Sequence, residues 1–406
     1  MHDAPVPTSD PTAPDAARRA RGTLRVLRAY AAFTYPFACV PFLYFHYADH
    51  GVTPAGFATL ISAYYVTMVA AEIPTGVLAD LRGQRAAMRI GPLVLAAGFA
   101  VIGLWPSYPG FYLGQVLLGL GHSILSGPPS ALLFRTLKGI GQSADYRRQE
   151  SVINMLRLLG TGVAFLLGGW LVDRHGIPTA IAATAVACTV ASVIAFALAA
   201  PPVARSATPG SGQRFHALAH AARDLRRPPV RWMLGYYVLL FFLLRFPFHT
   251  YQPFLREANA EDPMWIGVLF FALNLFAAPF SRLTPYLCRR FGLATMLWAM
   301  PLLLAVSMAV MAGRVDGFGI ALFFLHQVPF GMHWAVVQDY VQHRIDDAAR
   351  STVPSVLSFA GRLVFALLFP LTLASGEVAD GYLAVGVAGV VLTVVVMAVG
   401  RVHARG

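Results

Sequence analysis

Charged residues are scarce in this 406-residue sequence: Asp, Glu, Lys and Arg make up only 12% of it, whereas 57% is hydrophobic and the mean hydropathy is +0.61. A soluble domain has about 25% charged residues, so an ordinary soluble protein is excluded. The sequence also lacks anything that resembles a nucleotide-binding phosphate loop or a Ser-His-Asp order. We therefore expect no enzyme, no ATP-driven machine and no cofactor.

Cysteine is equally scarce. Cys39, Cys188 and Cys288 lie far apart, in hydrophobic runs or at their ends, so neither a disulfide framework nor a zinc site is expected. We expect no other metal site. The first residues are rich in Pro, Thr and Asp and lead into a basic run at 18–21, which is too polar for a cleaved signal peptide. We expect residues 1–26 to form a disordered arm.

Long hydrophobic runs occupy most of the remaining chain. Windows of roughly 19 residues predict twelve membrane spans, at residues 27–47, 57–79, 88–105, 110–134, 151–172, 178–199, 232–254, 264–285, 292–312, 317–340, 352–374 and 381–400. Each span should be helical, because lipid offers no hydrogen-bond partner to an open backbone, and the short alternating strands of a barrel are not seen. The sequence thus predicts an all-α membrane protein.

The net charge is +12, and the distribution of the basic residues along the chain indicates how the protein is oriented in the membrane. Most of the 31 Lys and Arg residues fall in loops on one side of the predicted spans, and Arg174, Arg256 and Arg314 are the ones in loops on the other side. Basic loops stay in the cytoplasm, so both termini are expected there. This pattern predicts contact with anionic membrane lipid and no nucleic-acid partner.

A polar segment divides the spans into two sets of six. Residues 201–231 contain two Pro-Pro pairs and several arginines, and we interpret them as a cytoplasmic linker between a bundle at 27–200 and a bundle at 232–400, with 401–406 as a cytoplasmic tail. Residues 214–227 fit either a short amphipathic surface helix or a solvated linker. Arg-Arg-Phe-Gly at 289–292 corresponds to Asp-Leu-Arg-Gly at 80–83, which indicates a weak internal duplication with a cavity between two similar bundles.

The most informative motif begins with Glu-Ile-Pro-Thr-Gly at 72–76. The loop between the second and third helices of the major facilitator superfamily has the pattern Gly, three residues, Asp, basic, any, Gly, basic, basic. The matching positions are Gly76, Asp80, Gly83 and Arg85, while Leu81 and Gln84 replace basic residues. The chain resembles this superfamily over roughly residues 27–400. The Glu-Ile-Pro-Thr-Gly run resembles a subgroup rich in bacterial exporters.

This resemblance implies twelve helices in two pseudo-symmetric bundles, in a bacterial plasma membrane. It implies a monomeric secondary transporter that exports a small organic molecule by alternating access, driven by protons or another coupling ion. Asp80 and Arg85 would act in the inner gate, with Arg350 near the partner of Asp80. Two alternatives stay open: an importer of a small metabolite, and a transporter-like scaffold that acts as a membrane enzyme or sensor through His122, His333 and Arg245.

Relatives in the subgroup that this chain resembles often carry acids where this sequence has Ser130 and Arg135, and the first span has no acid either. Glu72 is then the only carboxylate well inside the predicted spans. An ionised carboxylate in lipid must pair, face an interior cavity or be protonated. Glu72 is therefore either a coupling site or a permanent partner of Arg157 or of loop donors. His122 and His333 are further coupling candidates because histidine titrates near neutral pH, although inter-helix hydrogen bonding is the alternative for both.

Intramembrane cations suggest the substrate. Arg245 lies about fourteen residues into the seventh span, where a guanidinium needs an anion or a wet cavity. Spans one and seven are rich in aromatic residues and line the cavity in the superfamily fold, which suits a partly apolar, anionic molecule. The candidate cavity residues are Tyr35, Arg157, Arg245, His249, Gln252 and Arg362. Arg157 and Arg362 also fit inter-helix or gate pairs.

Overall fold

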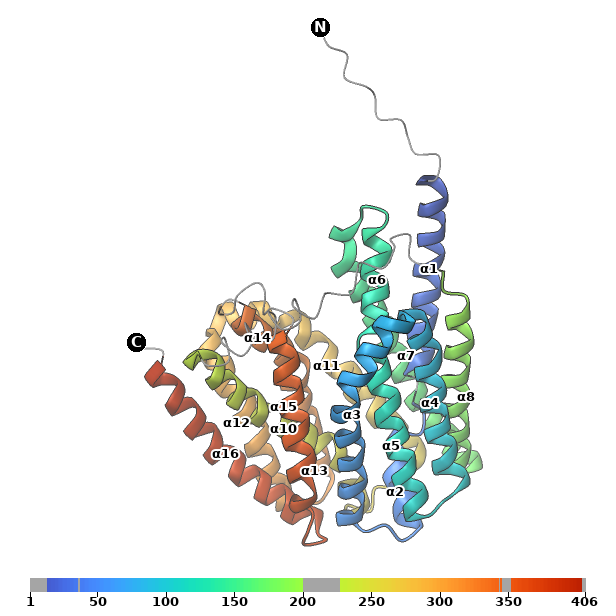
Figure 1. Cartoon of the computed structure of the whole chain (residues 1–406). Helices are drawn as coiled ribbons and strands as arrows, with labels where there is room; N and C mark the ends of the chain where they lie inside the picture. The colour runs from blue at the N-terminus through green and yellow to red at the C-terminus, as the bar shows by residue number, and fades with distance from the viewer. Residues whose placement is uncertain (1–12, 36, 200–226, 343, 345–351, 404–406) are drawn as a thin grey trace.

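The computed structural model describes residues 13–35, 37–199, 227–342, 344 and 352–403, and these form two helical bundles (Figure 1). The first bundle contains α1 (Ala13–Thr34), η1 (Val40–Phe42), α2 (Leu43–Asp49), α3 (Pro54–Arg82), α4 (Gln84–Leu104), α5 (Tyr108–Leu125), α6 (Pro128–Lys138), η2 (Ser143–Asp145), α7 (Tyr146–His175) and α8 (Ile177–Phe196). The second contains α10 (Pro228–Glu257), α11 (Pro263–Phe291), α12 (Leu293–Ala312), α13 (Gly317–Ala321), α14 (Phe323–Gln342), α15 (Thr352–Thr372) and α16 (Val378–His403).

Eleven helical segments of the described chain are long and apolar enough to cross a membrane, and the expected first span, which is broken between α1 and α2, is not among them. Large apolar side chains face outward: Leu104, Ile73 and Leu371 are 87%, 74% and 70% exposed. Such exposure is unfavourable in water and is expected where lipid covers the protein. The prediction of an all-α membrane protein is confirmed.

Helix ends differ from the expected boundaries in several places. Residues 13–26, expected in a disordered arm, belong to α1, because their alanines and arginines favour helix. α10 begins at Pro228, inside the expected linker, and α16 continues to His403. The suggested surface helix at 214–227 lies almost wholly outside the described residues.

The first span is not one continuous helix, as 27–47 was expected to be. It leaves helical geometry after Thr34 and resumes as η1 and α2, with Pro41 unable to donate a backbone hydrogen bond at the restart. The fourth span is also divided, between α5 and α6. There Pro128 and Pro129 begin the new helix, where their missing N–H groups cost least.

The two loops that suggested an internal duplication have similar backbone conformations. Gly83 ends α3 and starts α4 with φ 91° and ψ 151°, and Gly292 ends α11 and starts α12 with φ 84° and ψ 146°. A positive φ favours glycine at both positions. The two residues therefore form the same turn in each bundle.

A buried tyrosine repeats beside each turn. The Tyr30 hydroxyl on α1 donates to the carbonyl of Met88 at 3.1 Å, and the Tyr236 hydroxyl on α10 donates to the carbonyl of Leu297 at 3.0 Å. Each acceptor lies five residues after its glycine. The bundles thus share a tertiary contact that the sequence shows only as two distant tyrosines.

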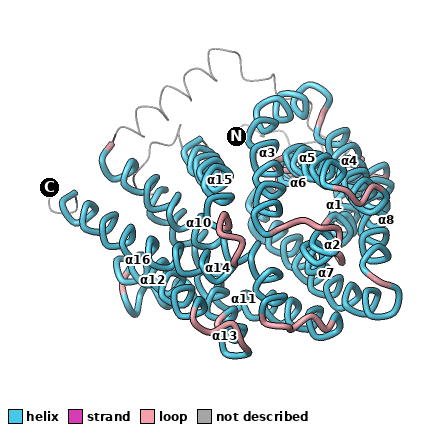
Figure 2. Tube along the Cα trace, turned by 90° about the horizontal axis from the view of Figure 1, so that it is seen from below, coloured by secondary structure: helices cyan, strands magenta, loops and turns pink. Residues whose placement is uncertain are grey.

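The two bundles meet along α7 with α11, α3 with α15, and α2 with α10 (Figure 2). We call the end where α1 begins and α16 ends the terminal side, and the end where α2 stops the far side (Figure 1). Gly169 and Gly267 let α7 and α11 touch through their backbones, since a Cβ on Gly267 would lie 2.8 Å from the carbonyl oxygen of Phe165.

Candidate functional site

A cavity of about 320 Å³ lies inside the first bundle, with one wall residue from the second. Its lining is Leu27, Tyr30, Ala31, Thr34, Tyr35, Met68, His122, Leu125, Ser126, Pro129, Ser130, Glu150, Ile153, Asn154, Arg157 and Arg362. Four of the candidates from the sequence therefore share one cavity: Tyr35, His122, Arg157 and Arg362.

Arg157 is the exposed cation of this cavity. Its guanidinium carbon lies 5.5 Å from the centre of the Tyr35 ring, a cation–π arrangement, and no carboxylate in the described chain pairs with it. The backbone holds both residues in place, because the Thr161 hydroxyl donates to the carbonyl of Tyr35 at 3.0 Å. A guanidinium held in this way offers its donors to an anionic ligand.

Glu72 pairs with Arg362 across the bundle interface. Nη1 of Arg362 donates to Oε2 of Glu72 at 3.1 Å, from α15 to α3, and the two side chains are 19% and 28% exposed respectively. The expected partner Arg157 is thus not the one that Glu72 uses here. Because Arg362 also lines the cavity, this ion pair links the cavity to the contact between the bundles.

His122 forms an aromatic wall of the cavity. Its ring lies 5.9 Å from the Tyr35 ring in a stacked arrangement and 5.5 Å from Tyr64 edge to face. Nδ1 lies 2.9 Å from the carbonyl oxygen of Leu118, which can only accept, so Nδ1 carries a hydrogen. Nε2 is then the nitrogen that is left to exchange a proton.

Two cavity residues on α7 were not singled out from the sequence. Glu150 and Asn154 lie four residues apart, and Arg157 follows three residues later. This i, i+4, i+7 spacing puts all three on one helical face, which is the signal that would have identified them. The Ser130 hydroxyl donates to Oε1 of Glu150 at 2.8 Å, so α7 supplies a carboxylate beside Ser130 of α6.

Arg245 lies in the second bundle and is not among the residues that line this cavity. Its guanidinium carbon is 5.4 Å from the centre of the Phe241 ring and 5.7 Å from that of Phe248, and no described carboxylate pairs with it. His333 is also in the second bundle, with Nδ1 donating to the carbonyl of Phe330 at 2.8 Å. The structure therefore separates these two candidates from Arg157 and His122.

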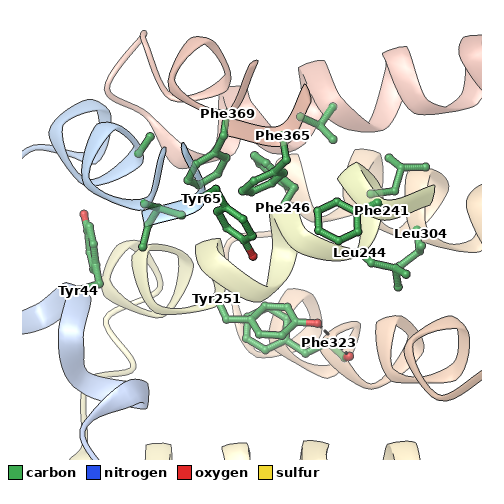
Figure 3. Packing of buried hydrophobic residues seen from close by; sticks show 14 of the residues in the cluster. Tyr44, Tyr65, Phe241, Leu244, Phe246, Tyr251, Leu304, Phe323, Phe365 and Phe369 are labelled. Atoms are coloured by element: carbon green, nitrogen blue, oxygen red, sulfur yellow. Dashed lines mark hydrogen bonds between the residues drawn. The ribbon is translucent and has the colours of Figure 1, made fainter. Parts of the chain in front are cut away.

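His249 belongs to the contact between the bundles. Its Nε2 lies 3.1 Å from the Tyr65 hydroxyl of α3. The Tyr65 ring also packs on Phe365 at 5.0 Å, and Phe365 stacks on Phe369 at 4.8 Å (Figure 3). Tyr65 lies seven residues before Glu72 on α3, which is about two helical turns. This aromatic cluster therefore lies closer to the far side than the Glu72–Arg362 pair does.

Gln252 is buried between the bundles, with 6% of its surface exposed. Its side-chain amide donates to the carbonyl of Val40 at 2.9 Å, and its side-chain oxygen accepts the backbone N–H of Tyr44 at 2.8 Å. Beyond it, Nη1 of Arg256 donates to Oδ1 of Asp49 at 3.0 Å. Gln252 thus joins α10 to the broken first span rather than lining the cavity.

The described gating-motif residues Gly76, Gly83 and Arg85 lie toward the terminal end of α3 and the start of α4. Arg85 donates to the carbonyl of Leu198 at 3.5 Å, within the first bundle. A Cβ on Gly76 would meet no heavy atom within 4 Å, so packing does not require glycine there in this conformation. Arg350 and the side chain of Asp80 lie outside what the structure describes.

Two bundles related by an internal repeat, with a polar cavity beside their interface, define a polytopic membrane transporter rather than an enzyme. The chain belongs to the major facilitator superfamily, whose family model matches residues 27–370. The comparison with curated protein sequences gives no match.

Solved structures share the fold. A mutant form of the nucleoside transporter NupG superposes with a TM-score of 0.76 at 15% identity, covering 94% of this chain and 99% of that chain. A bacterial homologue of the human lysosomal transporter Spinster, inward-facing and unoccupied, gives 0.70 at 14% identity and covers 97% of each chain. The peptide transporter POT with sulfate gives 0.70 at 14% identity and covers 94% of each chain. At such identities the likeness concerns the fold alone.

Proposed function

We propose that this protein is a secondary transporter that exports a small, partly apolar organic molecule carrying a carboxylate or similar anionic group. The observation that carries the proposal is Arg157, a cation that lines the cavity without a carboxylate partner in the described chain. Tyr35 and His122 add aromatic surface beside it. A ligand with an anionic head and an apolar body complements this combination.

The closed contacts support alternating access. At the edge of the cavity the bundles are joined by Glu72 with Arg362. Closer to the far side they are joined by Tyr65 with His249. Nearer the far side they are joined by Gln252 with the first span, and by Asp49 with Arg256. We infer that the cavity is reached from the terminal side in this conformation, and that transport requires these contacts to break.

Direction and orientation rest on the sequence. The basic loops favour a terminal side in the cytoplasm of a bacterial cell, so the cavity would load from the cytoplasm. The Glu-Ile-Pro-Thr-Gly run supports membership of the exporter-rich subgroup and hence export. Import of a metabolite is the alternative, and it uses the same cavity in the reverse order.

Coupling to protons is proposed for Glu72, which lies where the cavity meets the bundle interface. Protonation of Glu72 would remove its attraction to Arg362 and weaken one link between α3 and α15. His122 is the second candidate because Nε2 is left available.

We further propose that the protein works as a monomer with anionic lipid at its basic side, and that residues 200–226 link the two bundles.

A counterflow assay in proteoliposomes tests the proposal. Vesicles loaded with one organic anion should accumulate its labelled form, and Arg157→Gln should remove this accumulation while Arg157→Lys restores part of it, because only arginine offers a two-pronged contact. Arg174→Gln is a matched control on the same helix, since Arg174 pairs with Asp173 outside the cavity. Undiminished counterflow in Arg157→Gln, or transport restricted to lipophilic cations, would contradict the proposal.

A further inference from the structure

Helix α7 presents two opposite charges to the same cavity. Glu150 and Arg157 both line it and are seven residues apart. Seven residues are two helical turns, so the side chains share one face with an axial separation of about 10 Å. Asn154 lies between them and adds an amide to the same wall.

Neither charge is neutralised within the described chain. Glu150 accepts a hydrogen bond from Ser130, and Arg157 lies over the Tyr35 ring. The described ion pairs include neither residue. The basic residue Arg28 on the neighbouring helix α1 donates instead to Gln149 at 2.8 Å. Glu150 and Arg157 are therefore not an ion pair with each other.

The two charges also lie at different depths. α7 begins at Tyr146 on the terminal side, which places Glu150 about 6 Å along the helix and Arg157 about 16 Å along it. Arg362, the second cation of the cavity, is already paired with Glu72. Among the residues that line the cavity, the carboxylate of Glu150 thus lies nearer the terminal side, at the end that we call the mouth, and the guanidinium of Arg157 lies deeper.

We propose, building on the transport function above, that the substrate is amphoteric: its anionic group binds at Arg157 and its cationic group, an ammonium or guanidinium, binds at Glu150. A molecule with one charge makes only one of the two charge-assisted contacts that Glu150 and Arg157 offer. A dicarboxylate is repelled by Glu150 at the mouth. The distance between the two charges of α7 sets the length of the substrate.

Thermal stabilisation of the purified full-length protein tests this with molecules of known length. The probes are ω-aminoalkanoates from aminobutanoate to aminodecanoate, each with the fatty acid and the alkylammonium of equal chain length. One or two neighbouring lengths of aminoalkanoate should raise the melting temperature more than either single-charge partner. Their apparent affinity should fall roughly tenfold or more in Glu150→Gln and in Arg157→Gln, as expected for the loss of one charge-assisted contact.

Controls separate recognition from damage. Glu377→Gln and Arg174→Gln change the same residue types at exposed sites away from the cavity and should leave the affinity unchanged. Glu150→Lys should exchange the preference, so that dicarboxylates of the same length stabilise the variant and aminoalkanoates no longer do. A misfolded variant could not acquire this new preference for dicarboxylates.

The inference is overturned if no length of aminoalkanoate stabilises the protein more than its fatty acid, or if the preference survives in Glu150→Gln. This binding readout does not depend on transport. Ligand-dependent stabilisation without counterflow would contradict the proposed transport function and leave the amphoteric site standing. Counterflow of plain carboxylates that Glu150→Gln does not affect would contradict the amphoteric site and leave the proposed transport function standing.

Discussion

The side chain of Gln252 accepts the backbone N–H of Tyr44 at 2.8 Å and donates to the backbone carbonyl of Val40 at 2.9 Å. In a continuous α-helix Tyr44 would donate directly to Val40, four residues earlier. The amide of Gln252 is therefore inserted where the first span lacks a helical hydrogen bond, and it comes from the other bundle. The break in the first span and the closure of the far side share one contact.

Replacing Gln252 with Ala should leave a buried donor and a buried acceptor without partners. We expect the free energy of unfolding to fall by about 1–3 kcal/mol, and labelling of a cysteine introduced at the nearby buried residue 43 to become faster as the far side opens more often. Gln252→Glu keeps the acceptor but buries a carboxylate against the carbonyl oxygen of Val40, so its loss should be at least as large. Unchanged melting and labelling in Gln252→Ala would show that the contact has no role in closure.

The Glu72–Arg362 pair should control coupling. In Glu72→Gln we expect transport driven by a pH gradient to be lost while exchange of substrate for substrate continues, because exchange needs no net proton movement. Both are measured with labelled substrate in proteoliposomes.

Asp316→Asn is the matched control, since Asp316 pairs with Arg314 in a far-side loop away from the cavity. If gradient-driven transport persists in Glu72→Gln, coupling must be assigned to His122, or the protein must be a uniporter.

The contact of α7 with α11 should tolerate no side chain at Gly169. A Cβ there would lie 2.7 Å from the carbonyl oxygen of Pro263, so Gly169→Ala should cost about 1–3 kcal/mol of stability. Gly235→Ala is the control within a helix, because its Cβ would meet nothing within 4 Å. That control should be neutral or stabilising by about 0.5–1 kcal/mol. Equal melting temperatures for the two variants would contradict the close backbone contact.

Gly76 should matter only in the state that this structure does not show. A Cβ at Gly76 would meet no heavy atom within 4 Å here, so Gly76→Ala should leave melting of this conformation nearly unchanged. If α3 approaches α15 when the terminal side closes, the same variant should slow counterflow several-fold, and Asp80→Asn should do likewise. Normal turnover in both variants would remove the gate assignment.

The sequence by itself determined the class of this protein and the pattern of its spans. Long apolar runs force helices in lipid, basic loops indicate orientation, and the run from Glu72 to Arg85 indicates the family, all of which are local properties of the chain. The correspondence of residues 80–83 with 289–292 was also visible, although the positive φ of Gly83 and Gly292 was seen only in the structure.

Only the tertiary structure decided which polar side chains meet. Glu72 pairs with Arg362, 290 residues away, Gln252 completes the first span instead of lining the cavity, and Glu150 joins Arg157 and His122 around one space. Each of these contacts depends on how helices from distant parts of the chain rotate and cross. Periodicity along one helix predicts the face on which a residue lies, but the partner of that face is set by packing between helices.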